Sequence, residues 1–171
     1  MNPDQVMVEA LRRLQPLVPA CAAEVAVLAD RLGEVNAELW ALEDEARSTD
    51  SDARLASVKR SIDDRNQRRA DLVSQIDWAL STAIAAHFAD VAPLTCSVGG
   101  ALDRLTVAAL RVRTLLAAGD ERAGFALRQL EDLLQAMDAD WSDLRAGRRR
   151  LPQPGALKRY GAQPEALSET R

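Results

Sequence analysis

Charged and amide side chains continue the apolar stripe of two predicted helices. From residue 36 to 47 the sequence reads N-A-E-L-W-A-L-E-D-E-A-R, and from 59 to 77 it reads K-R-S-I-D-D-R-N-Q-R-R-A-D-L-V-S-Q-I-D. With 3.6 residues per helical turn, Glu43 and Arg47 fall on the same face as Trp40. A buried polar group is costly unless it has a partner. These side chains therefore form either a closed salt-bridge network or a ligand site.

The two helices are joined by a short turn and should pack side by side as an antiparallel pair. We therefore expect the face of Trp40, Glu43 and Arg47 to meet the polar face of the next helix. The predicted site also takes in the charged pair near the start of the fourth helix. Its members are Trp40, Glu43, Arg47, Lys59, Asp63, Asn66, Arg69, Asp77, Asp103 and Arg104.

Two ligand chemistries fit these residue types. Arg47, Lys59 and Arg69 could hold a phosphate or a carboxylate, with Trp40 as an apolar wall. Carboxylates are the ligands that Mg²⁺ and Mn²⁺ prefer, so a divalent metal is the second alternative. That metal site would use Glu43, Asp44, Asp63 and Asp77. The pattern specifies no reaction, so catalytic residues stay unknown and enzymatic activity stays open.

Composition places the chain among single-domain helical proteins. Its 171 residues are 47% hydrophobic and 28% charged but only 4% aromatic, and no stretch alternates for long enough to predict a strand. The net charge of −4 disfavours nucleic acid as a partner. We expect a cytoplasmic protein without membrane contact, because the sequence shows no secretory signal and no membrane-spanning run. Cys21 and Cys96 fit reduced thiols.

Apolar periodicity and turn residues predict an all-α fold. We expect an up-and-down bundle of four main helices plus a short N-terminal helix, forming a domain over residues 1–147. An extended basic tail, 148–171, should pack on the bundle or trail from it. The predicted helices cover residues 4–14, 20–47, 52–87, a segment capped by Thr95 or Ser97 and ending near 118, and a fifth that follows the turn at 119–120 and ends near 144.

The fifth helix carries the most regular apolar spacing in the chain. Its stripe alternates steps of four and three residues: Ala123, Leu127, Leu130, Leu134, Met137, Trp141 and Leu144. Such a seam packs against other helices. An exposed seam would seek a second copy, so a homodimer is a further expectation.

Four sequence blocks resemble a bacterial family of unknown function, number 4254 among the domains of unknown function. The blocks are E-L-W-x-x-E-D-x-A-R (38–47), K-R-x-I-D-x-x-N-Q-x-R (59–69), S-V-G-G-A-L-D-R-L-T (97–106) and K-R-Y (158–160) with Pro164. The chain departs from the family pattern at Ala70, Ser74, Gly161 and Ala162. Any function that depends on the family's usual residues at these four positions is therefore in doubt for this chain.

The resemblance implies a helical bundle and a link to glycan or sugar-nucleotide metabolism. Combined with the inward-directed charges, it leads us to expect a protein that binds or acts on a small anionic metabolite, a phosphorylated sugar or nucleotide. The alternative is a non-catalytic helical adaptor for a glycosyltransferase-type partner protein. The adaptor would need only an outward apolar face, which the fifth helix could supply.

Overall fold

The computed structural model describes residues 3–84 and 90–153, and within them every regular element is a helix. The all-α prediction is confirmed. Short 3-10 turns at Pro3–Gln5 and Gln15–Leu17 flank the first α-helix. The α-helices are α1 (Val6–Leu14), α2 (Ala22–Ser48), α3 (Asp52–Ala83), α4 (Val98–Ala117) and α5 (Ala123–Arg145). The third helix ends at Ala83, before the predicted end at residue 87. Residues 85–89 and most of the tail lie outside the described residues.

Serine side chains cap the N-termini of α3 and α4. Ser51 Oγ accepts from the backbone N–H of Arg54 at 3.4 Å, and Ser97 Oγ accepts from that of Gly100 at 3.1 Å. Each serine thereby satisfies one of the donors that a helix start leaves unpaired. Of the two predicted caps for the fourth helix, the structure uses Ser97.

Glycines in the left-handed conformation end α4 and α5. Gly119 has a φ of 64° and Gly147 a φ of 66°. After α4, the N–H of Gly119 donates to Leu116 O and that of Asp120 to Leu115 O. This pair of bonds satisfies the last carbonyls of the helix, and the required positive φ favours glycine.

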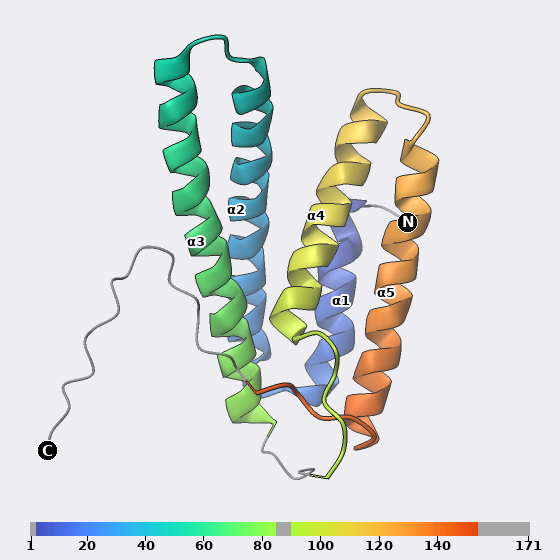
Figure 1. Ribbon diagram of the computed structural model, residues 1–171. Helices are drawn as coiled ribbons and strands as arrows, with labels where there is room; N and C mark the ends of the chain where they lie inside the picture. The colour runs from blue at the N-terminus through green and yellow to red at the C-terminus, as the bar shows by residue number, and fades with distance from the viewer. Residues whose placement is uncertain (1–2, 85–89, 154–171) are drawn as a thin grey trace, which may run out of the picture.

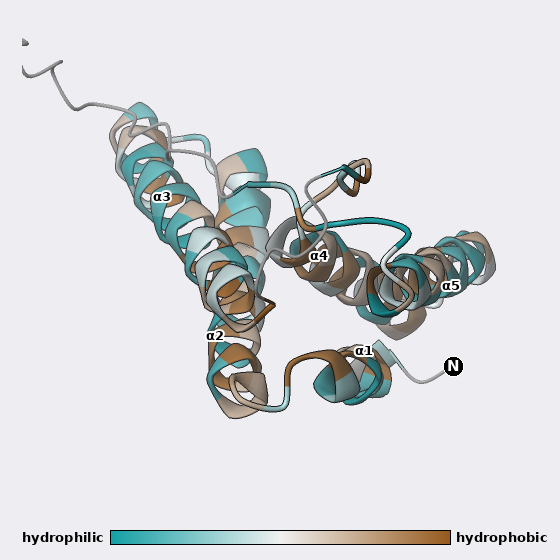
Figure 2. Ribbon diagram, turned by 90° about the horizontal axis from the view of Figure 1, so that it is seen from below, coloured by the Kyte–Doolittle hydropathy of each residue, from teal (hydrophilic) through white to brown (hydrophobic). Residues whose placement is uncertain are grey.

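The helices form an up-and-down arrangement of two long hairpins, α2–α3 and α4–α5, with α1 beside the second (Figure 1). The view from below shows α4 between the α2–α3 pair and α5 (Figure 2). Helix α4 contacts all four other α-helices. Toward their turns the two hairpins diverge, so α4 covers only part of the length of α2 and α3 (Figure 1).

The apolar stripe of α5 belongs to the core of the chain itself. Leu130, Leu134, Met137 and Trp141 are buried, and α5 packs against α1 and α4. This confirms the packing role of the seam. The stripe does not face outward, because α1 and α4 cover it. A homodimer stays a prediction, but it would have to use another surface.

The described part of the tail pairs with the segment that precedes α4. Leu94 N donates to Arg150 O at 2.9 Å, and Arg150 N donates to Ala92 O at 3.2 Å. Leu151 packs against the hydrophobic core. Residues 148–153 therefore lie on the bundle. None of the helices in the described ranges combines the length and the apolar character needed to cross a bilayer.

Candidate functional site

A buried polar cluster joins three helices where α4 crosses the first hairpin. Arg69 of α3 donates to Asp103 of α4 through two bonds, Nε to Oδ1 at 2.7 Å and Nη2 to Oδ2 at 2.6 Å. Asn36 of α2 donates from Nδ2 to the same Oδ1 at 2.9 Å. The exposed fractions of the Arg69 and Asp103 side chains are 35% and 12%. Hydrogen bonding to Asp103 raises the pKa of Arg69.

Asp77 supports the beginning of α4 from the neighbouring helix. Its Oδ1 accepts from the backbone N–H of Gly99 at 2.7 Å, and its carboxylate also bonds the Ser97 side chain. Burial raises the pKa of Asp77, although both hydrogen bonds lower it. A carboxylate at a helix N-terminus satisfies unpaired N–H groups and complements the helix dipole. Asp77 therefore supports the start of α4, a role that was not predicted from the sequence.

The upper half of the predicted site is not enclosed. Arg47, Lys59, Asp63 and Asn66 are exposed, and after Leu39 no residue of α2 is fully buried. The expectation that these groups are buried between the two helices is wrong, whereas their role in ligand binding stays a prediction. Its physical reason is the divergence of the hairpins: beyond the crossing of α4, α2 packs on α3 alone, so the buried face of each helix is narrower (Figure 1).

Ion pairs do connect this exposed half of the hairpin, but between other residues. Glu38 pairs with Arg65 across the two helices, and Glu45 pairs with Arg54 near the turn. Arg47 pairs with Asp44 within its own helix. Solvent-exposed pairs of this kind contribute little to stability. Trp40 and Glu43 are half-buried beside them.

The alternative metal site is not assembled. Asp63 and Asp77 are fourteen positions apart in α3, about 21 Å along the helix axis at 1.5 Å per residue. Asp77 is committed to the start of α4, whereas Asp44 pairs with Arg47. Across the described ranges, no group of three or more His, Cys, Asp or Glu side chains lies close enough together to hold a metal ion.

Two members of the predicted site, Arg69 and Arg104, do meet in one groove. It lies between α3, α4 and α5 and has a volume of about 550 Å³. Arg111 of α4 lines the same groove, with Gln129 and Asp132 of α5 opposite. Arg111 Nη1 donates to Gln129 Oε1 at 3.4 Å. The groove therefore brings three guanidinium groups together from two helices.

The charges of this groove do not cancel. Asp103 neutralises Arg69, and Asp132 is the acidic residue among the described lining residues. Arg104 donates to the sulfur of Cys96 at 2.6 Å, and Arg111 to a neutral amide. Among the residues that line the groove, Arg104 and Arg111 against Asp132 leave one positive charge in excess. Burial raises the pKa of the Cys96 thiol, and the neighbouring Arg104 opposes part of that rise.

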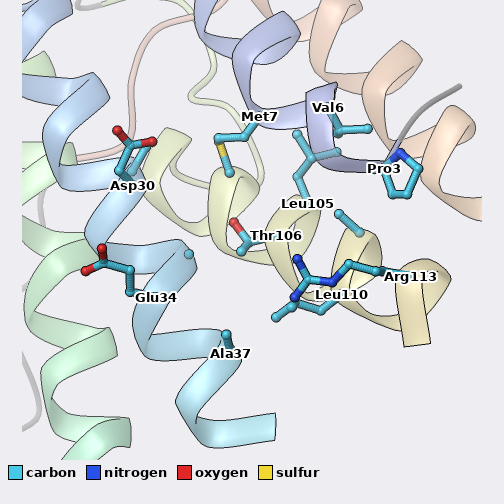
Figure 3. A pocket seen from close by; sticks show the side chains of 13 residues that line it. Pro3, Val6, Met7, Asp30, Glu34, Ala37, Leu105, Thr106, Leu110 and Arg113 are labelled. Atoms are coloured by element: carbon cyan, nitrogen blue, oxygen red, sulfur yellow. The ribbon is translucent and has the colours of Figure 1, made fainter. Parts of the chain in front are cut away.

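A second cavity, of about 430 Å³, lies between α1, α2 and α4. Figure 3 shows Asp30 and Glu34 of α2 on the opposite side of this cavity from Arg113 of α4. Apolar side chains, including Met7 and Leu105, line the space between them. The cavity contains none of the predicted site residues, and its charges are of mixed sign.

One known family matches the part of the chain that includes the crossing of α4 and the first hairpin. The profile of the family described as "Protein of unknown function (DUF4254)" matches residues 26–153. The chain belongs to this family. In this DUF4254 protein the match extends from α2 to the described end of the tail and includes both Asn36 and Asp103. No curated protein and no solved structure matches the chain.

Sequence reasoning missed Asn36 and Arg111 as site residues. Asn36 begins the polar stripe and is only 3% exposed, so a buried amide within an apolar face was the available signal. Arg111 stands seven residues after Arg104, which places both on one face of α4. Of the predicted pair Asp103 and Arg104, Asp103 pairs with Arg69, whereas Arg104 lines the groove.

Proposed function

We propose that this DUF4254 protein binds a small phosphorylated metabolite in the groove between α3, α4 and α5. The observation that carries the proposal is the convergence of Arg69, Arg104 and Arg111 on one groove with a positive charge in excess. Guanidinium groups present planar N–H donors that match phosphate oxygens. A volume of about 550 Å³ is ordinary for a small-molecule site.

The buried cluster supports this proposal by holding one guanidinium in place. An arginine side chain has five N–H donors, and Asp103 takes two of those of Arg69. Asn36 fixes Asp103 in turn. A side chain held in one conformation loses less entropy when it binds a ligand. The proposal covers binding in the cytoplasm and leaves open whether a reaction follows.

Titration calorimetry with inorganic phosphate, glucose 1-phosphate and adenosine monophosphate tests the proposal. Arg104→Gln and Arg111→Gln should each weaken binding about tenfold, because a charge-assisted hydrogen bond contributes about 1.5–3 kcal/mol. Arg31→Gln is the matched control, since it removes the same charge from an exposed position on α2. Absence of binding by all three anions and by an alkyl phosphate, or an equal loss in the control, would overturn the proposal. Parallel titrations with Mg²⁺ test whether a divalent metal contributes.

The adaptor remains the second candidate, and its supporting observation is no longer the apolar stripe of α5, which is buried. Trp78 of α3 is 65% exposed, and Phe125 is 55% exposed. Exposed large apolar side chains of this size are common at protein interfaces. If the protein is an adaptor, Trp78→Ser should abolish co-purification of a defined partner while phosphate binding is absent. Retained co-purification by that variant would count against Trp78 as the contact.

A further inference from the structure

The apolar lining of the α3–α4–α5 groove is its less exposed part and is called its floor here, whereas most of its charged residues are exposed and form its rim. Val107 and Ala108 of α4 and Ala126 and Leu133 of α5 line it. Ala126 is buried, whereas Val107, Ala108 and Leu133 keep part of their surface exposed. The two alanines have short side chains, which leaves room between the helices. A ligand in this groove would therefore contact hydrocarbon over much of its surface.

The two arginines that α4 contributes to the groove start from different points along the helix. Arg104 and Arg111 are separated by seven positions of α4, about 10 Å along the helix axis. Val107 and Ala108 lie between them on the same face of the helix. A free phosphate ion bound to these guanidinium groups would leave the apolar floor uncovered. A ligand with both an anionic group and an apolar body would use both kinds of surface.

We propose that the groove selects an amphipathic phosphate, a phosphate monoester whose organic part is a hydrocarbon chain or ring. The phosphate contacts the guanidinium groups of the rim, and the organic part lies on Val107, Ala108 and Leu133. This inference rests on the proposed function and narrows it: an apolar ester is preferred over a sugar phosphate, whose hydroxyl groups would lose water on that floor without finding partners.

Titration of the full chain with a series of alkyl phosphates tests this inference. Methyl, butyl and octyl phosphate carry the same anionic group on hydrocarbon chains of increasing length. Glucose 1-phosphate carries that group on a polar organic part instead. Burial of apolar surface predicts that affinity rises about twofold to fourfold for each added CH₂ group that enters the groove. Octyl glucoside, with the same chain and no charge, should bind at least tenfold more weakly than octyl phosphate.

Substitutions in the apolar floor separate the contribution of the ligand's hydrocarbon part from that of its phosphate group. Ala108→Leu should fill the apolar part of the groove and flatten the dependence of affinity on chain length. Val107→Thr keeps the shape of the side chain and adds a hydroxyl group, so it should weaken the binding of octyl phosphate more than that of methyl phosphate. It also serves if Ala108→Leu fails to fold, which circular dichroism would show.

The possible outcomes of these titrations lead to different conclusions. If methyl phosphate and octyl phosphate bind equally well, or glucose 1-phosphate binds more tightly than butyl phosphate, the inference is overturned and the anion site stands. If octyl phosphate and octyl glucoside bind equally, the groove recognises hydrocarbon alone and the inference again fails. If no phosphate binds, the proposed function itself is wrong.

Discussion

Arg69 and Asp103 connect α3 to α4 through two parallel hydrogen bonds, of 2.7 Å and 2.6 Å. The pair lies where α4 crosses the first hairpin, and Asn36 of α2 completes its contacts. One carboxylate thus joins three helices. Because Arg69 also lines the groove, the same contact serves both the packing of the bundle and the position of a candidate ligand-binding group.

Asp103→Ala should lower the free energy of unfolding by about 2–3 kcal/mol, because it leaves Arg69 and Asn36 without their acceptor. We place the loss below that of a fully buried pair, since the Arg69 side chain is 35% exposed. Urea denaturation measures the effect. Arg47→Met is the control: its partner Asp44 is exposed, so the loss should stay within about 0.5 kcal/mol. Equal losses in the two variants would contradict the assignment.

Replacing the whole cluster by apolar residues should restore most of the stability. In the triple variant Asn36→Leu, Arg69→Met and Asp103→Leu, no partner is left unsatisfied. We therefore expect a free energy of unfolding within about 1 kcal/mol of the wild-type value. The same variant should bind phosphate more weakly, because it lacks one guanidinium of the groove. A triple variant less stable than Asp103→Ala would show that the polar contacts themselves hold the helices together.

Asp77 should make stability depend on pH. Burial raises its pKa above the ordinary value of 3.8, so the folded state binds the proton more tightly than the unfolded state does. The stabilising contribution is present at low pH and is lost as pH rises through the folded-state pKa. Asp77→Asn keeps an oxygen for Gly99 and does not titrate. Its stability relative to wild type should therefore increase from about pH 4 to pH 7.

Urea denaturation of both proteins across this range measures the difference. Asp77→Ala is the companion variant, because it removes the acceptor as well as the charge. It should be less stable than Asp77→Asn by about 1 kcal/mol at each pH, the usual contribution of a side chain that caps a helix. A pH-independent gap between Asp77→Asn and wild type would show that Asp77 does not titrate in the folded state as inferred.

Two glycines should respond in opposite directions to the same substitution. A Cβ atom on Gly99 would lie 2.4 Å from the carbonyl oxygen of Val73, so Gly99→Ala must push α3 and α4 apart. We expect a loss of about 1–3 kcal/mol. At Gly33 the nearest atom, Thr106 Cγ2, would be 3.9 Å away, so Gly33→Ala should stabilise α2 by about 0.5–1 kcal/mol. Melting temperatures of the two variants give the signs directly.

The helices and their ends are determined locally, and the sequence alone predicts them. Ser97 begins α4 and the turn at Gly119 ends it, as expected, because capping and left-handed φ depend on a few neighbouring residues. Helical periodicity likewise identified the apolar seam of α5, from Ala123 to Leu144. The family resemblance, confirmed over residues 26–153, came from the same local strings.

Only the tertiary structure decided which part of the polar stripe is enclosed. Helical periodicity specifies the angle of a side chain around its helix but not how far along that helix a partner extends. Asn36 and Arg69 lie where α4 crosses, so they are covered; Arg47 and Lys59 lie beyond it and face solvent. Likewise, α1 and α4 cover the α5 seam, which periodicity alone could have assigned to a second copy. The groove also depends on the packing of separate helices, because Arg69 and Arg111 are forty-two positions apart in the sequence and meet only when α3 and α4 pack together.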